Sequence, residues 1–355
     1  MKPLKITSFL FATFFASALF SQEGKVKNII LLIGDGMGTA QIYAAMSVSN
    51  DNLNIERAQY VGFSKTYSAN NYITDSGAGG TAIATGKKTK NTYIAVDTNG
   101  APIKSILKYA MDHKMSAGMV TTCDLAHATP ASFVANDDSR YHCNEITLDY
   151  KEVLPDLLIG GGSHRFDSLG VSQFYKDNGY FVSYDLNSIG NKYKKDKILC
   201  LVAEEHPLPI FQGRDPNYLK DAVEIALKKL SLNDEGFFLM VEGSQIDWGG
   251  HANNLKYVMT EVYDFDKAVG VAFDFADNNP GTLVIVTADH ETGGLTLPEG
   301  DLENKTVSGT FSTLHHSGVM VPIFAYGHGA KDFSGIMQNT EIFNKMMNAY
   351  GFNAD

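Results

Sequence analysis

Cysteine is scarce in this chain, and its few copies exclude several kinds of structure. Cys123, Cys143 and Cys200 are the only cysteines among 355 residues, and none has CxxC spacing, so a thiolate metal site is not expected. Three cysteines allow at most one internal disulfide. Buried free thiols are the simpler expectation.

Basic residues are also in deficit. The 29 Lys and Arg residues face 40 Asp and Glu residues, which gives a formal net charge of −11. An acidic surface argues against nucleic acid or an anionic membrane as the main partner. A small anionic substrate is still compatible with this charge, because bound divalent cations reverse the sign of the local field.

Long apolar runs are missing beyond the N-terminus. The first segment, MKPLKITSFLFATFFASALFSQ, has Lys2 and Lys5 before a short apolar stretch that ends in small residues, which is typical of a secretory signal peptide. We expect cleavage after Ser21 rather than after Ala18, because the polar sequence starts there. We therefore expect residues 1–21 to be a signal peptide and residues 22–355 to form a single domain. The mature protein should be periplasmic or secreted, without a membrane span.

What the sequence does contain is an alternation of apolar segments of strand length with amphipathic segments of helix length. The strand-like segments are VKNIILLIG, SAGMVTT, DLLIGG, GFFLMVEG, TLVIVTAD and VMVPIFAYG. Helices are expected at 101–113, 217–230 and 253–277, and near the C-terminus. Near-continuous apolar strands that alternate with helices predict an α/β fold, in which a doubly wound, mostly parallel central sheet has helices on both faces.

Acids and histidines follow the predicted strands. Asp35 ends the first strand, Glu242 ends FFLMVEG, and TLVIVTAD ends at Asp289 with His290 next to it. The segment CDLAHATPAS follows another strand, and TLHHSG precedes the last one. In such sheets, ligands bind at the carboxyl ends of the strands. One acid at a strand end is common, but acids and histidines at four strand ends indicate a shared site.

These side chains suit divalent metals. Zinc prefers a few imidazole and carboxylate ligands. In DWGGH, Asp247 and His251 are four residues apart, and the glycines between them let the backbone bring both toward one point. Either His315 or His316 offers a further imidazole. Together with the strand-end residues, these ligands suffice for two zinc ions.

Oxygen donors for a harder ion are also present. Asp35 is placed to bridge toward such an ion, and Glu242 and the Thr129 hydroxyl suit magnesium. Each residue alone has a simpler explanation, because an aspartate at a strand end is usually part of a turn or a helix cap. A lone histidine more often lies on the surface or in the core than on a metal. We assign five histidines to that class: His113, His142, His164, His206 and His328.

A candidate nucleophile lies in YITDSGAGGTAIATG. Ser76 opens a helix of small residues, 77–84, and the N-terminus of a helix stabilises negative charge on a serine oxygen or on a phosphoryl group attached to it. The small side chains would let the backbone and metal ions approach closely. Alone, the segment also fits a tightly packed structural helix with Thr74 or Asp75 as its N-cap.

Five segments together resemble one known family. DSGAGGTAIATG, HATPASFVANDDSR, EGSQIDWGGH, TADHETGG and HSG occur in the order and spacing of the alkaline phosphatases. Nearly the whole mature chain is similar to the compact bacterial members, including cold-active ones. The stretch between DHETGG and HHSG is short, so no large inserted domain is expected there.

The resemblance implies a role for each matching residue. Ser76 resembles the nucleophile that becomes phosphorylated, and Arg140 matches the arginine that holds the phosphoryl oxygens, a task that suits the planar fork of arginine. The implied ligands are Asp247, His251 and His316 for a first zinc, Asp35, Asp289 and His290 for a second zinc, and Asp35, Thr129 and Glu242 for a magnesium ion. We call these sets the first, second and third metal sites.

Two positions depart from the best-studied enterobacterial member. His127 stands where that enzyme has an aspartate, and Trp248 stands where it has a lysine. Imidazole is a poor magnesium ligand and a good zinc or cobalt ligand, so zinc or cobalt is expected to compete for the third site. His127 acts either as a ligand there or through a hydrogen bond to bound water or phosphate, with Trp248 nearby.

The resemblance implies a secreted, metal-dependent phosphate monoester hydrolase that forms a phosphoserine intermediate and accepts a broad range of phosphomonoesters. A homodimer is expected by family analogy. The alternatives are a phosphodiesterase or sulfatase of the same superfamily, and a non-catalytic exported protein that binds phosphate or metal. A sulfatase would need Pro and Arg after its modified residue, which DSGAGG lacks.

Overall fold

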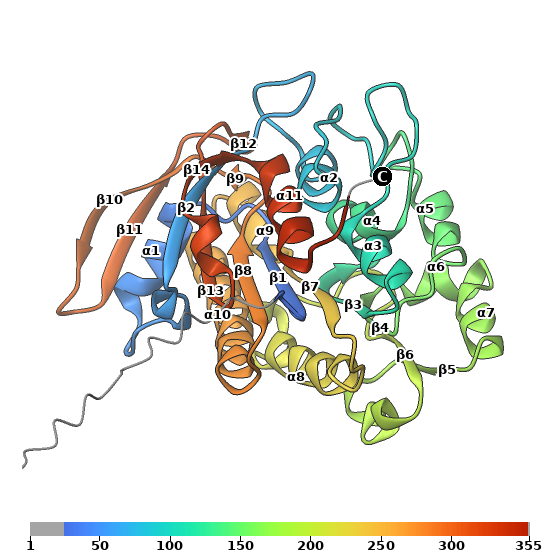
Figure 1. The fold of residues 1–355 in the computed structure, drawn as a ribbon. Helices are drawn as coiled ribbons and strands as arrows, with labels where there is room; N and C mark the ends of the chain where they lie inside the picture. Colours follow the sequence, from blue (N-terminus) through green and yellow to red (C-terminus); the bar gives the residue numbers. More distant parts are fainter. Residues whose placement is uncertain (1–24, 354–355) are drawn as a thin grey trace, which may run out of the picture.

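The computed structural model describes residues 25–353, so the predicted signal peptide lies outside the described residues. A ten-stranded sheet forms the centre, in the order β14-β2-β13-β8-β1-β7-β3-β4-β6-β5 (Figure 1). Its strands are β1 (Asn28–Gly34), β2 (Tyr60–Lys65), β3 (Ser116–Asp124), β4 (Leu157–Gly161), β5 (Tyr180–Ser183), β6 (Lys197–Leu201), β7 (Phe237–Gly243), β8 (Thr282–Thr287), β13 (Val321–Gly327) and β14 (Gly335–Gln338).

The sheet is mostly parallel, as predicted. Its two antiparallel pairings are those of β13 with β2 and with β8. All six predicted strands are present, five of them slightly shorter than predicted and β3 two residues longer, whereas β2, β5, β6 and β14 of this sheet were not predicted. In the register of the central strands, Ile33 of β1 lies opposite Glu242 of β7 and Thr287 of β8. The carboxyl ends of these strands therefore lie level with one another.

Helices cover both faces of the sheet (Figure 1). They are α1 (Thr39–Val48), α2 (Ser76–Thr85), α3 (Ile106–Asp112), α4 (Ala128–Val134), α5 (Cys143–Asp149), α6 (Ser163–Ser168), α7 (Val171–Asp177), α8 (Tyr218–Leu230), α9 (Gln245–His251), α10 (Leu255–Asn278) and α11 (Asn339–Tyr350). Alternate residues of β1 enter different cores: Leu31 packs in a cluster with residues of α2, α3 and α11, whereas Leu32 packs in one with residues of α8 and α10. The predicted doubly wound α/β fold is confirmed.

One predicted helix is shorter than its sequence pattern indicated. The segment expected to be helical over 101–113 begins its helix only at Ile106, where the Ser105 hydroxyl caps α3 by accepting from the Lys108 amide at 3.4 Å. Pro102 lies in an isolated bridge with Val96 instead. The Ile103 amide also donates to the Ala95 carbonyl oxygen at 2.8 Å, so this stretch pairs with the preceding segment and the helix begins after it.

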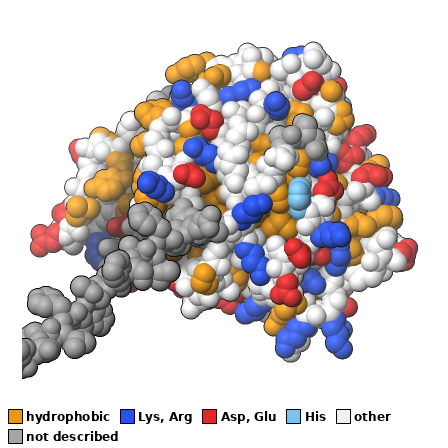
Figure 2. Space-filling model, viewed as in Figure 1, with side chains coloured by type: hydrophobic (Ala, Val, Ile, Leu, Met, Phe, Trp, Pro, Cys, Tyr) orange, Lys and Arg blue, Asp and Glu red, His pale blue; other side chains and the backbone are white. Residues whose placement is uncertain are grey.

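The stretch between DHETGG and HHSG is a hairpin of β10 (Leu295–Asp301) and β11 (Thr306–Phe311) that projects from the body of the molecule (Figure 1). Two short strands flank it and pair with each other, β9 (Glu291–Thr292) and β12 (His316–Ser317). Basic and acidic side chains are interspersed on the face in Figure 2. Within residues 25–353, no helix has the length and hydropathy that crossing a membrane requires.

Candidate active site

The predicted strand-end residues meet at one edge of the sheet. Asp35 follows β1, Glu242 lies at the end of β7, and Asp289 follows β8. All three carboxyl groups are fully buried, as is His290. A buried carboxylate is costly unless a positive charge or hydrogen-bond donors compensate for it. This edge therefore needs cations or hydrogen-bond donors to stabilise its buried carboxylates.

The first site has the spacing of a zinc centre. Asp247 Oδ1 lies 3.4 Å from His251 Nε2 and 3.5 Å from His316 Nε2, and the two Nε2 atoms are 3.2 Å apart. Donor atoms around a tetrahedral zinc, at bond lengths of about 2.0–2.1 Å, are about 3.3–3.4 Å apart. His315, in contrast, is exposed. The structure thus brings His316 rather than His315 to the other two residues.

The glycines of DWGGH act differently from the prediction. The segment is one turn of α9, and helical geometry alone places Asp247 and His251 on the same face. A Cβ atom on Gly249 would lie 2.8 Å from the Val258 amide nitrogen, and one on Gly250 would lie 2.8 Å from the Thr292 carbonyl oxygen. These glycines therefore let neighbouring segments approach the helix.

Hydrogen bonds turn three imidazole rings the same way. The Nδ1–H groups of His251 and His316 donate to the carbonyl oxygens of Leu314, at 2.6 Å, and Thr74, at 2.9 Å. The Thr292 hydroxyl donates to Asp247, so it accepts from Nδ1–H of His290 at 3.2 Å. All three Nε2 lone pairs then face the carboxylates, which is how metal-binding histidines are oriented.

The second site lies next to the first. His290 Nε2 is 3.1 Å from Asp289 Oδ2 and 3.4 Å from Asp35 Oδ1, and neither carboxylate atom has a hydrogen-bond partner. Asp247 also comes within ligand distance of Asp35 and His290, so it stands between the two sites. Burial, and then the charges of Asp289 and Asp247, raise the pKa of Asp35 well above its usual value. Bound cations would offset this repulsion.

The first site favours positive charge. A hydrogen bond to Asp247 raises the pKa of His251 to about 9. Burial works against the charged form of Asp247, but the His251 hydrogen bond and the charges of the neighbouring imidazoles bring its pKa below the usual range. Cations and protons therefore compete for the same place.

Ser76 lies beside the second site. It begins the ten-residue helix α2, is almost fully buried, and has its Oγ 3.2 Å from His290 Nε2. Asp75 caps the helix by accepting from the Ala78 amide at 3.0 Å, which settles the choice between Thr74 and Asp75. The small residues permit the approach that was expected, because a Cβ on Gly79 would lie 3.1 Å from the Asp289 carbonyl oxygen.

Arg140 is held next to this helix. Its Nη1 donates to Asp75 Oδ2 at 3.1 Å, and its Nη2 is 3.5 Å from His127 Nε2. Although burial opposes the charge, the Asp75 carboxylate raises the pKa of Arg140 further. A guanidinium and a helix N-terminus with Ser76 between them form a surface suited to a phosphoryl group.

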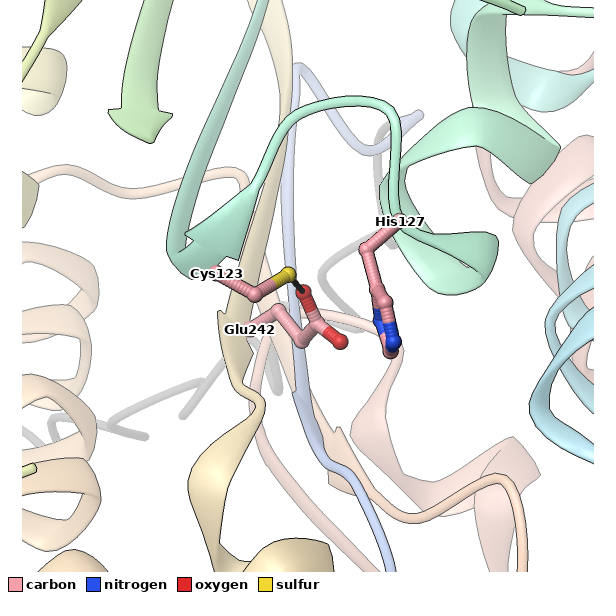
Figure 3. A group of neighbouring side chains, drawn as sticks. All are labelled: Cys123, His127 and Glu242. Carbon is pink, nitrogen blue, oxygen red and sulfur yellow. Dashed lines mark hydrogen bonds between the residues drawn. The ribbon is translucent and has the colours of Figure 1, made fainter. Parts of the chain in front are cut away.

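The third site departs in part from the sequence interpretation. Thr129 lies in α4, and its Oγ1 is 3.5 Å from Asp35 Oδ2, so it reaches the site from a helix. His127 instead occupies the N-cap position of α4, after the turn that follows β3. Burial raises the pKa of Glu242 to about 7. Cys123 and His127 both point toward the Glu242 carboxylate (Figure 3).

Several neighbours of the site were missed or set aside. Cys123 was dismissed because it lacks CxxC spacing, and His206 was assigned to the surface and core histidines. The His206 ring lies 4.9 Å from the Trp248 ring and 5.8 Å from that of His127, and its Nδ1 accepts from the Asp124 amide. His206 lies in a loop after a strand that was not predicted, so its neighbours in the sequence do not indicate that it lies near the site. All three cysteines are free, but Cys143 is partly exposed rather than buried.

Carboxylates, imidazoles and a serine hydroxyl gathered at the strand ends of a doubly wound sheet are typical of a metal-dependent hydrolase. A sequence model of the alkaline phosphatase family matches residues 26–309. The chain belongs to the alkaline phosphatase family.

Relatives support this assignment along the chain. Alkaline phosphatase 3 of Bacillus subtilis is 32% identical over an alignment, gaps included, of 428 residues. The alignment covers 95% of this chain and 92% of that protein. The alkaline phosphatase of the Antarctic bacterium TAB5 is 38% identical, with a TM-score of 0.87 over 94% of this chain and 100% of that one. A variant of that enzyme, with aspartate in place of one histidine, has magnesium bound in one of its metal sites.

The resemblance to cold-active members is also confirmed. The cold-active alkaline phosphatase of a psychrophilic Shewanella is 30% identical, with a TM-score of 0.85 over 91% of this chain and 99% of that one. The predicted enzyme class, a metal-binding phosphoric monoester hydrolase of the alkaline phosphatase type, is confirmed by the family and these relatives.

Proposed function

We propose that this chain is a secreted phosphomonoesterase that acts through a phosphoserine intermediate on Ser76 and accepts a broad range of phosphomonoesters. The observation that carries the proposal is the position of Ser76 Oγ, 3.2 Å from His290 Nε2 at the N-terminus of α2, with Arg140 held by the adjacent Asp75. A nucleophile, a cation-binding edge and an anion-binding surface thus meet at one point.

Three divalent ions fit the residues present. The buried, unpartnered oxygens of Asp35, Asp289 and Glu242 and the inward-facing imidazole lone pairs support two zinc ions and one further ion. The first zinc would be held by Asp247, His251 and His316, the second by Asp35, Asp289 and His290, and the third ion, magnesium or else zinc or cobalt, by Asp35, Thr129 and Glu242. Bound there, the metals supply Lewis acidity that lowers the pKa of the serine hydroxyl and of water and offsets charge on the leaving oxygen.

The chain's own groups position two displacements at phosphorus. Ser76 Oγ loses its proton and forms a bond to phosphorus while the ester P–O bond breaks, and the alcohol leaves with a proton. Water then attacks the phosphoseryl phosphorus, the Oγ–P bond breaks, Ser76 regains a proton, and inorganic phosphate departs. Arg140 donates to equatorial oxygens throughout, fixed by Asp75, and the N-terminus of α2 faces the same charge.

Substrate breadth follows from which part of the ester is held. The groups in this proposal grip the phosphoryl group, and none of them is assigned to the alcohol portion. We place His127 and Trp248 beside the bound phosphate, because their rings lie 6.2 Å apart and His127 is adjacent to Arg140. The aspartate variant of the TAB5 enzyme binds magnesium in a metal site. This supports a third site here whose metal depends on whether its nearby side chain is a histidine, such as His127, or an aspartate.

Export and assembly complete the proposal. We place the mature protein in the periplasm or outside the cell, on the basis of the signal-peptide features of residues 1–21. A homodimer is proposed by analogy with the family. Small phosphomonoesters are its substrates, and no nucleic-acid-binding role is proposed for a chain with a net charge of −11.

A comparison of three nitrophenyl esters tests the reaction class. The metal-loaded enzyme should hydrolyse p-nitrophenyl phosphate much faster than bis(p-nitrophenyl) phosphate or p-nitrophenyl sulfate, because Arg140 and the third site both engage an oxygen that a diester lacks. Removal of metal with a chelator should abolish turnover, and zinc with magnesium should restore it. Faster turnover of the diester would make the chain a phosphodiesterase, and binding of phosphate without any turnover would make it a non-catalytic binding protein.

A further inference from the structure

We propose that Cys123 is a metal ligand. Its thiolate and the His127 imidazole would join Glu242, which the third site shares with Asp35 and Thr129, and these sulfur and nitrogen donors would select zinc or cobalt over magnesium there. The inference rests on the proposed function, because it names the chemistry of one of its metal sites. It also replaces the expectation, drawn from cysteine spacing, that this chain has no thiolate metal site.

The three side chains converge from two adjacent strands and the segment that follows one of them. Cys123 lies on β3, Glu242 on β7 next to it in the sheet, and His127 just beyond β3 (Figure 3). One ligand atom from each comes within 4.8 Å of the others. The Cys123 Sγ is 3.3 Å from Glu242 Oε2. Around a tetrahedral zinc, with sulfur at about 2.3 Å and oxygen at about 2.0 Å, these two atoms would be about 3.5 Å apart.

A second observation points to a cation at this place. Glu242 is fully buried, and its Oε1 has no hydrogen-bond partner. Nδ1 of His127 is also buried without a partner. Buried polar atoms in native proteins nearly always have a partner, so two orphans beside one thiol need an explanation. A metal ion bound among the three groups supplies the missing partner to Glu242 Oε1, and it binds Nδ1 of His127 in the tautomer that carries the ring proton on Nε2.

The thiol is held in position rather than free to turn away. Cys123 and Thr121 are alternate residues of β3, and both side chains reach Glu242. The Thr121 hydroxyl donates to Glu242 Oε2 and lies 3.2 Å from Cys123 Sγ and 2.9 Å from Ser244 Oγ. This network fixes the carboxylate and the sulfur together, as the outer hydrogen bonds of metal sites do.

The donor set decides which ion is preferred. Magnesium takes oxygen ligands in near-octahedral geometry, whereas thiolate and imidazole suit zinc and cobalt. When the metal binds, the S–H bond of Cys123 breaks, a sulfur–metal bond forms, and the proton leaves to solvent. The alternative is a thiol that only donates a hydrogen bond to Glu242, and that thiol would show no sulfur–metal bond under any loading.

Cobalt substitution tests the proposal, because a thiolate bound to Co²⁺ gives an intense near-ultraviolet charge-transfer band that nitrogen and oxygen ligands do not. The purified mature enzyme would be stripped with a chelator and reloaded with three equivalents of Co²⁺. The band should appear in the wild type and in the matched controls Cys143→Ser and Cys200→Ser, and should be lost in Cys123→Ser. Absence of the band in the wild type, or its persistence in Cys123→Ser, would overturn the proposal.

Two further measurements distinguish a failure of this inference from a failure of the proposed function. Zinc X-ray absorption of the fully zinc-loaded wild type should show sulfur at about 2.3 Å, so the result does not depend on the folding of any variant. Labelling of Ser76 and turnover of p-nitrophenyl phosphate are followed on the same samples. An active, labelled enzyme without zinc–sulfur scattering overturns only this inference, whereas zinc–sulfur scattering in an enzyme without turnover overturns the proposed function instead.

Discussion

Asp75 joins the nucleophile helix to the phosphate-binding arginine: its Oδ2 accepts from Arg140 Nη1 at 3.1 Å, while its Oδ1 caps α2 through the Ala78 amide at 3.0 Å. One carboxylate therefore sets both the entry of the helix that begins at Ser76 and the direction of the guanidinium. Geometry at the phosphoryl group should be sensitive to this single residue.

Replacing Asp75 should separate its two tasks. Asp75→Asn keeps a capping oxygen but presents a neutral amide to Arg140, so we expect phosphate to inhibit about tenfold more weakly and KM to rise, with little change in stability. Asp75→Ala should add a loss of about 1 kcal/mol in the free energy of unfolding, because the cap is gone. Inhibition constants and denaturant unfolding measure the two effects. Equal phosphate inhibition in the wild type and Asp75→Asn would show that the ion pair does not orient Arg140.

The first zinc site can be tested with neighbouring histidines. His316 Nε2 lies 3.5 Å from Asp247 Oδ1, whereas His315 is exposed. His316→Ala should lose about one zinc per chain and at least about a hundredfold in kcat/KM, because a zinc site left with two protein ligands binds poorly. The matched control His315→Ala should keep its zinc and most of its activity. Metal analysis alongside kinetics decides, and the reverse ranking would refute the assignment.

Magnesium at the third site should depend on His127. His127→Asp replaces a nitrogen donor with an oxygen donor and adds a negative charge, so magnesium should activate the variant at clearly lower concentrations than the wild type. The measurement is phosphatase activity during a magnesium titration of enzyme depleted at the third site. A titration curve that matches the wild type would mean that His127 does not set the magnesium affinity.

A buried charge cluster away from the active site predicts how stability varies with pH. Arg214 donates to both Glu261 and Asp264, so two buried carboxylates share one cation. Burial raises the pKa of Asp264 to about 7, above the unfolded value of about 3.9. The folded state then keeps a proton that the unfolded state releases, so this contribution to stability is present below about pH 4 and is lost as the pH rises to about 7.

Asp264→Asn should therefore reduce the slope of the free energy of unfolding against pH between about pH 4 and 7. The reduction should be at most the slope that a difference of about one bound proton produces. Denaturant unfolding of the wild type and the variant across this range measures the slope. Asp274→Asn, which changes an exposed aspartate of the same helix, is the control. An unchanged slope in Asp264→Asn would show that this carboxyl group titrates alike in both states.

The sequence predicted the elements that rest on local pattern. The seven buried residues of β1 and the apolar spacing of α8 lead directly to a sheet covered on two faces. The i, i+4 spacing of Asp247 and His251 fixes their shared direction once α9 is helical. Peripheral strands such as β2, which lies second from one edge of the sheet and exposes Tyr60 and Val61, have no continuous apolar run and were missed for that reason.

Contacts that depend on strand order could not be predicted in this way. Cys123 contacts Glu242 because β3 pairs with β7, although 118 residues lie between them in the chain. The sequence of neither strand predicts that pairing. His206 reaches Trp248 from a loop whose path depends on packing around β6. Such contacts arise from tertiary structure, which sequence spacing does not report.

The central claim is that Ser76 carries the phosphoryl group during turnover. Enzyme incubated briefly with labelled phosphate and quenched in acid should carry the label on the peptide that contains Ser76, and the label should disappear in Ser76→Ala. That variant should lose most of its activity. A small remaining activity is expected, because a bound metal ion would activate water for direct attack. Label on any other residue, or full activity in Ser76→Ala, would contradict the account.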